Sequence, residues 1–338
     1  MNHLLSSKKL KIWGLIISIV LLIASFMISV AVGQISIPFS TVVEAFTVYN
    51  QSTTEHIIIR TTRLSRAVIA LVVGASLAIA GALMQAITRN PLASPSIFGI
   101  NAGALFFIVF TATFFPAASL VEYMWIGFLG ALIAEILVYF LGSLGRDGLS
   151  SIKIVLAGAA ITALFLSFTQ GLLVINQQSL EGILFWLAGS VAGRSLDMLK
   201  PILPYMTGSV ILALFLSSHI NILMSGEDVA RGLGQRTILI KVLMGFIIVF
   251  LAGGSVAVAG SIGFIGLIVP HIARIFVGND YRWVISYSMV LGGTLLLMAD
   301  VAARFIIMPQ EMPIGVVTAL IGAPFFIFVA RRGFKSNG

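Results

Sequence analysis

Apolar residues dominate the chain in long runs that short polar segments separate. The runs lie at about 12–32, 67–88, 97–115, 121–142, 154–175, 202–219, 238–258, 262–277, 284–304 and 312–331. Most of them approach the length of roughly 20 residues that one helix needs to cross a bilayer. Because lipid offers the backbone no hydrogen-bond partners, such runs are expected to be helical. The pattern predicts an all-α polytopic membrane protein with about ten transmembrane helices.

Two segments depart from this simple pattern. The run at 262–277 is short and contains Gly263, Gly266 and Pro270. Interrupted apolar segments of this kind are tolerated where other helices bury them, so a broken, buried helix is expected here. The segment 176–201 is too polar and too rich in glycine to span, and an external loop with a short helix is expected there.

Composition supports a membrane protein and excludes several other classes. Of 338 residues, 59% are hydrophobic and 9% are charged, whereas soluble domains carry about 25% charged residues. The net charge is +8, but no basic run with interleaved aromatic residues occurs, so no nucleic acid is expected as a partner. There are no cysteines, and the four histidines are scattered. No metal site and no cofactor are therefore expected.

The distribution of basic residues orients the chain. With the N-terminus in the cytoplasm, ten spans return the C-terminus there, and 14 Lys and Arg residues fall inside against six outside. This bias agrees with the positive-inside rule and predicts a multi-pass protein of the cell membrane with both termini in the cytoplasm. Three of the six outside residues are clustered, namely Arg60, Arg63 and Arg66.

The first apolar run could be mistaken for a signal peptide. Lys8, Lys9 and Lys11 precede it, and Ser29 and Ala31 form a faint small-x-small cleavage pattern. The run is longer than the roughly 7–15 apolar residues of a signal peptide. An uncleaved first span is favoured, and cleavage stays open.

A sequence repeat divides the chain into related halves. Gly74–Gly81 recurs as Gly253–Gly260 at an offset of 179 residues, and the same offset carries Pro91 onto Pro270. The copies lie in the second and seventh spans, which run in opposite directions, and inverted repeats are typical of transporters. If the copies are true repeats, the two prolines should break or end their helices at corresponding places. A chance match of small residues is the alternative.

We therefore expect a single permease domain over 1–338. Its repeat halves are placed at about 60–175 and 238–331, and a cytoplasmic loop lies at about 220–236.

No constellation of catalytic residues is visible. The chain contains no Gly-Lys pair, so it has no phosphate-binding G-x-x-x-x-G-K-[ST] loop and is not expected to be an enzyme. Glu135 and Asp300 are the main acids inside predicted spans. Either could relay protons. Asp300 lies four residues before Arg304, so an ion pair on one helix face explains it equally well. Glu135 has no visible partner.

The loop between the sixth and seventh predicted spans combines charged and small apolar residues. Acidic residues near a helix start, followed by apolar residues three positions apart, predict a short amphipathic helix. Docking to a cytosolic partner explains this pattern better than a solvated loop does. The candidate residues are Gly226, Glu227, Asp228, Ala230, Leu233 and Gly234.

Several stretches resemble the iron-siderophore and cobalamin permeases of binding-protein-dependent ABC importers. They cover the chain nearly end to end: Arg63–Arg66, Val73–Ala75, Ala80–Gly81, Gln85, Arg89–Ala93, Pro95, Gly263–Arg274, Ala299–Asp300, Ala303–Arg304, Glu311–Thr318 and Gly322–Phe326. Ser65 departs from the family, where many members have proline, which should alter only the local turn.

The resemblance implies ten helices per subunit and a pathway between two permease subunits, the second being a copy or a paralogue. It implies two cytosolic ATPase subunits docked on Gly226–Gly234 and an extracytoplasmic substrate-binding protein. It implies that Leu156–Leu173 line the pathway. Acidic residues of the binding protein would dock on Arg63, Arg66 and Arg304.

The expected function is therefore ATP-driven import of an iron(III)-siderophore complex, with ATP hydrolysed on a separate subunit. Haem and cobalamin are rival cargoes within the same family. A proton-coupled secondary transporter that uses Glu135 or Asp300 is the alternative from another class, and a membrane-embedded enzyme is a distant third.

Overall fold

The computed structural model describes residues 4–115, 119–144, 151–175 and 186–335, and in these ranges the regular structure is helical without strands. Seven helices are long and apolar enough to cross a membrane, and three further apolar helices are shorter. The helices that correspond to the ten apolar runs are α1 (Lys8–Ala31), α4 (Leu64–Thr88), α5 (Ile100–Phe114), α6 (Leu120–Ser143), α7 (Ser151–Ile175), α10 (Leu203–Met224), α12 (Thr237–Ile248) with α13 (Gly254–Ala259), α14 (Ile265–Val277), α15 (Tyr281–Ala303) and α16 (Ile314–Lys335). The predicted all-α polytopic architecture is confirmed.

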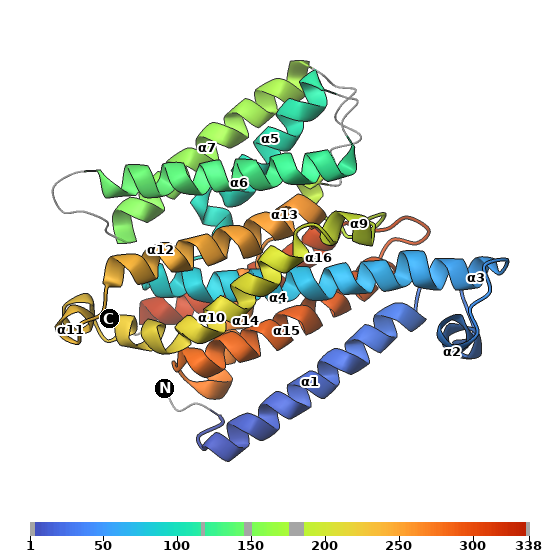
Figure 1. The fold of residues 1–338 in the computed structure, drawn as a ribbon, viewed down its shortest axis with the longest axis horizontal. Helices are drawn as coiled ribbons and strands as arrows, with labels where there is room; N and C mark the ends of the chain where they lie inside the picture. The colour runs from blue at the N-terminus through green and yellow to red at the C-terminus, as the bar shows by residue number, and fades with distance from the viewer. Residues whose placement is uncertain (1–3, 116–118, 145–150, 176–185, 336–338) are drawn as a thin grey trace.

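Short elements connect these helices. They are α2 (Phe39–Thr47), α3 (Thr54–Ile57), the π-helix η1 (Ile58–Arg63), the 3-10 helix η2 (Pro95–Phe98), α9 (Leu196–Leu199), α11 (Glu227–Gly232) and the π-helix η3 (Val249–Gly253), which joins α12 to α13. The start of α4 marks one end of the bundle, here called the Arg66 end. The opposite end carries α11, and α1 begins and α16 ends on that side (Figure 1).

Helix α4 forms the centre of the bundle. It lies between α15, α14 and α12, while α5, α6 and α7 form a layer on one side and α1 packs along α15 on the other (Figure 1). Glycines allow this crowding: an added Cβ at Gly74 would overlap the carbonyl of Gly292, and one at Gly81 would overlap that of Gly266. Small residues that let helix backbones approach closely are the common device of membrane bundles.

The seventh span ends early, at Gly260. Its φ of +76° is a left-handed conformation that favours glycine, and an added Cβ would overlap the carbonyl of Trp186. The chain is then non-helical until Ile265, where α14 begins. The predicted break therefore lies before α14, which itself runs through Pro270 as one helix.

The prediction that Pro91 and Pro270 end helices at corresponding places is wrong. Pro91 follows the end of α4 at Thr88, whereas Pro270 lies inside α14. The seventh span ends where Gly260 lies against the backbone of Trp186. The inverted repeat itself stays a prediction.

Only part of the polar segment predicted as a loop at 176–201 lies within the described residues. Residues 176–185 lie outside the described part of the chain, and the remainder consists of the helical residues 186–188 and a loop that leads to α9.

Candidate functional site

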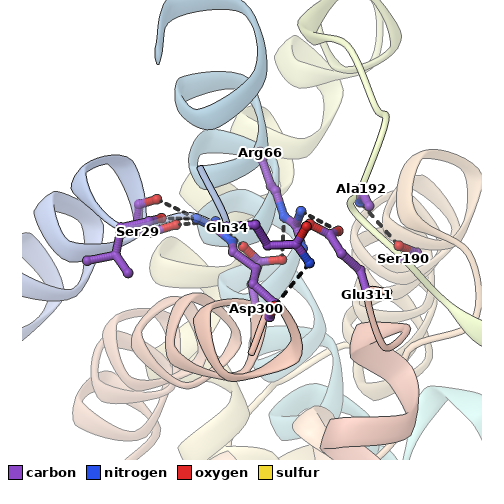
Figure 2. Close-up of polar contacts among 9 residues, drawn as sticks. Ser29, Gln34, Arg66, Ser190, Ala192, Asp300 and Glu311 are labelled. Atoms are coloured by element: carbon purple, nitrogen blue, oxygen red, sulfur yellow. Dashed lines mark hydrogen bonds and ion pairs between the residues drawn. The ribbon is translucent and has the colours of Figure 1, made fainter. Parts of the chain in front are cut away.

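A cluster of charged side chains lies at the Arg66 end of the bundle. Arg66, in the first turn of α4, donates from Nε to Asp300 Oδ1 at 2.7 Å and from Nη1 to Glu311 Oε2 at 2.7 Å. Arg304, which follows α15, donates to the other carboxylate oxygen of Asp300. Figure 2 shows Arg66 between the two carboxylates. The ion pair expected between Asp300 and Arg304 is confirmed.

The remaining donors of the cluster hold the end of α1. Arg304 Nη1 donates to the carbonyls of Ser29 and Val32 at 2.7 and 2.6 Å. Arg63 Nη1 donates to the carbonyl of Ala31 at 2.6 Å, and its Nη2 donates to that of Ile35 at 2.5 Å. The last carbonyls of a helix lack partners within the helix and carry partial negative charge, so guanidinium groups suit them well. The cluster therefore joins α1, α4 and α15.

The three arginines that the resemblance assigns to docking are buried in the structure. The relative exposures of Arg63, Arg66 and Arg304 are 5%, 8% and 2%. Arg63 and Arg304 donate from Nη1 and Nη2 to the chain's own carbonyls and to Asp300, because the ends of α1 and α15 meet beside them. Arg66 is different, since its partner Glu311 has a side chain that is 30% exposed. The docking role of the three arginines stays a prediction.

Sequence reasoning missed several partners in this cluster. The acceptors Glu311 and Ser29 were not singled out for it, and neither was the Gln34 amide, which donates to the carbonyl of Arg304 at 3.1 Å. Ser29 and Glu311 are polar residues beside apolar spans, and that was the only available signal.

A short helix, α11, lies where one was predicted, at the other end of the bundle. Gly226 and Gly234 flank it with φ values of +125° and +80°, which glycine adopts without strain. Glu227 Oε1 accepts from Arg231 Nη2, and its Oε2 accepts from Lys241 Nζ, both at 2.8 Å. The hydrogen bond from Lys241 lowers the pKa of Glu227 below its ordinary value.

The exposed face of α11 differs from the one expected. Leu233 is 69% exposed, and Val229, one turn earlier, is also exposed. Ala230, a predicted contact residue, is completely buried by its own chain, so it presents no side chain to a partner. Its place is taken by Val229, which the three-residue spacing did not indicate. Asp228 is exposed beside these residues.

Glu135 lies alone between α6 and α12. Both carboxyl oxygens are buried, and within the described ranges neither has a hydrogen-bond partner. The side chain lines an apolar pocket of about 380 Å³ together with Tyr139, Phe140 and Phe246. No cluster of three His, Cys, Asp or Glu residues that could hold a metal occurs in the described part of the chain. Tyr139, one turn further along α6, is the titratable side chain that lies beside Glu135 in this pocket, and no further acid, histidine or basic residue is among the described residues that line it.

Known proteins resemble the chain along nearly its whole length. The FecCD transport family matches residues 21–332. The probable siderophore transport system permease protein YfiZ of Bacillus subtilis (strain 168) is 54% identical, over 95% of this chain and 96% of YfiZ. The ferric enterobactin transport system permease protein FepD of Escherichia coli (strain K12) is 40% identical, over 95% of each chain.

The fold has a solved counterpart as well. A structure described as an inward-facing conformation of a metal-chelate type ABC transporter superposes with a TM-score of 0.81. It is 32% identical in sequence, and the match covers 94% of this chain and 98% of that one. The sequence relatives are transport permeases and not enzymes. The bundle, its motifs and these matches together show that the chain belongs to the FecCD transport family.

Proposed function

We propose that the chain is the permease subunit of an ABC importer that carries an iron(III)-siderophore complex into the bacterial cytoplasm. The observation that carries this proposal is the end-to-end match to siderophore permeases, combined with an exposed pair of apolar side chains, Val229 and Leu233, at one end of the bundle. The cargo arrives wrapped in its chelator, so the permease needs no metal ligands of its own.

Energy enters at α11, which is placed on the cytoplasmic side by the charge bias of the loops. A cytosolic ATPase subunit docks on Val229 and Leu233, which form an exposed apolar pair one helical turn apart. Burying such side chains contributes roughly 25 cal/mol per Å² of apolar area. The proposed coupling residues are thus Gly226, Glu227, Asp228, Val229, Leu233 and Gly234.

Cargo enters at the opposite, Arg66 end, where an extracytoplasmic binding protein delivers it. Of the three arginines considered for docking, Arg66 supports this role most directly, because its partner Glu311 is partly exposed. The carboxylate of a partner protein could replace Glu311 there without disturbing Arg63 or Arg304.

A second permease subunit, a copy or a paralogue, completes the pathway. Helix α7 supports this arrangement, because Leu156, Leu164 and Phe168 leave a large apolar face uncovered within one subunit. That face lies in Leu156–Leu173, the segment expected to line the pathway.

Transport by reconstituted vesicles tests the function. The permease is reconstituted with the ATPase and binding protein encoded beside it, and uptake of radioactive ferric hydroxamate, ferric citrate, haem and cobalamin is compared. We expect ATP-dependent uptake of a ferric chelate that survives collapse of the proton gradient. Uptake of haem or cobalamin alone would reassign the cargo, and uptake that needs the gradient but not ATP would favour a secondary transporter.

The orientation can be tested in the same vesicles. The chain has no cysteines, so single cysteines at Ser6 and Ser195 report accessibility to an impermeant maleimide without background. We expect labelling of Ser195→Cys from outside and of Ser6→Cys only after permeabilisation. The reverse pattern would overturn the orientation.

A further inference from the structure

A small pocket opens at the Arg66 end between η1 and the loop before α9. Its volume is about 150 Å³, and its polar lining consists of Thr61, Thr62, Arg66, Arg194 and Ser195. Two arginines and three hydroxyl-bearing residues thus line one space, and the described residues around it include no carboxylate. Pockets for drug-sized ligands measure about 300–1,000 Å³, so this one suits a side-chain group or a small anion and not a whole metal chelate.

Arg194 is the distinctive residue of the pocket. Its guanidinium carbon lies 4.2 Å from the centroid of the Trp186 ring, a cation–π contact. Its Nε is buried and has no hydrogen-bond partner in the part of the chain that the structure describes. Burial lowers the pKa of Arg194 to about 10, so the group is still charged at neutral pH. A buried, charged donor without an acceptor is costly unless a ligand supplies one.

The loop that carries Arg194 is fixed to the bundle by backbone hydrogen bonds. Ser261 N–H donates to the carbonyl of Trp186 at 2.9 Å, and Ser190 N–H donates to that of Ala259 at 2.8 Å. The indole Nε1 of Trp186 donates to the carbonyl of Ala257 at 3.3 Å. Figure 2 shows the next turn of this loop, in which Ala192 N–H donates to the hydroxyl of Ser190. The position of Arg194 is therefore set before any ligand arrives.

Arg66 supplies the second cation, and one of its three guanidinium nitrogens is free to donate a hydrogen bond. Its Nε and Nη1 are engaged by Asp300 and Glu311, while its Nη2 makes no hydrogen bond in the described ranges. An acid that entered the pocket would meet Arg66 on one side and Arg194 on the other. Arg194 suits this task because the planar fork of a guanidinium group binds a carboxylate through two parallel hydrogen bonds, and Arg66 can add a further hydrogen bond from Nη2.

We propose that this pocket receives one carboxylate side chain of the extracytoplasmic binding protein and that Arg194, together with Arg66, holds it. The inference rests on the proposed function, because it needs a partner that docks at this end. It adds Arg194 to the docking surface, whereas Arg63 and Arg304 hold the backbone carbonyls at the end of α1, and Arg304 also pairs with Asp300. A free anion is the competing occupant.

Binding kinetics of the intact complex test the proposal. The permease, bound to its ATPase in lipid nanodiscs, is titrated with the binding protein encoded beside it, at low and at high salt. We expect Arg194→Gln to weaken binding by at least about tenfold, as truncation of one partner of a desolvated charge pair does, and to reduce the salt dependence. Arg194→Lys should fall in between, because it keeps the charge and loses the fork.

Lys200→Gln is the matched control. Lys200 lies six residues further on, and its exposed pair with Asp197 leaves it outside the pocket. Its variant should bind within about twofold of the unmodified protein. Equal binding by Arg194→Gln and the unmodified protein would overturn the proposal while leaving the proposed function in place. No binding by the unmodified protein would overturn both.

Cross-linking supplies a second readout. Ser195→Cys, the only thiol in the variant chain, carries a benzophenone maleimide to the mouth of the pocket. We expect it to capture the binding protein on illumination, and Ser225→Cys at the opposite end should not. Fluorescence of Trp186 that responds to acetate in the absence of the partner, without capture of the binding protein, would assign the pocket to a free anion and overturn the proposal.

Discussion

Arg66 and Asp300 lie 234 positions apart in the sequence, yet Nε of the first donates to Oδ1 of the second at 2.7 Å. The two carboxylate oxygens of Asp300 are shared between Arg66 and Arg304, and the Asp300 side chain is completely buried. Asp300 therefore joins the beginning of α4 to the end of α15. A carboxylate buried in an apolar bundle is costly unless it is paired, and guanidinium groups at both helix ends supply its partners.

Removing the charge of Asp300 should destabilise the bundle. Asp300→Asn leaves the buried guanidinium group of Arg304 without a carboxylate and that of Arg66 with Glu311 alone, and loss of one partner of a buried pair costs about 3–5 kcal/mol. Asp197→Asn is the matched control, because the Asp197–Lys200 pair is exposed and such pairs contribute roughly 0–1 kcal/mol. Denaturant unfolding in mixed micelles measures both variants, and equal losses would contradict a structural role for the cluster.

Close helix packing should make Gly81 intolerant of even one methyl group. In Gly81→Ala the new Cβ overlaps the carbonyl of Gly266, and overpacking costs about 1–3 kcal/mol or more. Gly208→Ala in α10 has open space around its Cβ, so it should be neutral or stabilising by up to about 1 kcal/mol. Thermal stability and the yield of monodisperse protein compare the two. A stable Gly81→Ala protein would show that α4 and α14 can separate.

Leu233 should couple the permease to its ATPase. Leu233→Asp places a charge on the exposed apolar face of α11, so uptake should be lost while the melting temperature is unchanged. Ala230→Asp should instead lower the melting temperature, because that side chain is buried in its own chain.

Ser6→Asp at the same end of the bundle controls for added charge. Normal uptake by Leu233→Asp at normal expression would remove α11 from the coupling pathway.

The attachment of α11 should depend on pH through Glu227. The hydrogen bond from Lys241 lowers the pKa of this carboxyl, so its stabilising contribution is complete above the ordinary pKa. The contribution is lost as the pH falls through the lowered value. Lys241→Met should raise that pKa towards its ordinary value and shift the loss of order in α11 to higher pH.

Hydrogen exchange of the α11 amides between about pH 3 and 6 measures this shift. Lys200→Met, far from α11, should leave the profile unchanged. Identical profiles for Lys241→Met and the unmodified protein would mean that the contact with Lys241 does not stabilise α11.

Glu135 should be dispensable for uptake. Its carboxyl group is buried without a partner, so Glu135→Met replaces an unsatisfied polar group by an apolar one and should preserve or increase stability. ATP-driven uptake should be retained with and without a proton gradient. Loss of uptake in a correctly folded Glu135→Met protein would favour the proton-coupled secondary transporter.

Sequence alone was sufficient for the number and placement of the helices and for the short helix α11. Whether a segment can cross a membrane depends on its own length and apolar content, so each apolar run could be judged without its neighbours. The ion pair of Asp300 with Arg304 could also be predicted from the sequence, because a spacing of four residues places both side chains on one helix face.

Tertiary structure decided which side chains are free to act. The turn of α11 against the bundle buried Ala230 and exposed Val229, and the meeting of α1 with α15 enclosed Arg304 and Arg63. Trp186 ended the seventh span at Gly260 and positioned Arg194 beside Arg66. The partner of a charge depends on contacts between segments far apart in the chain, and no local pattern of residues contains that information.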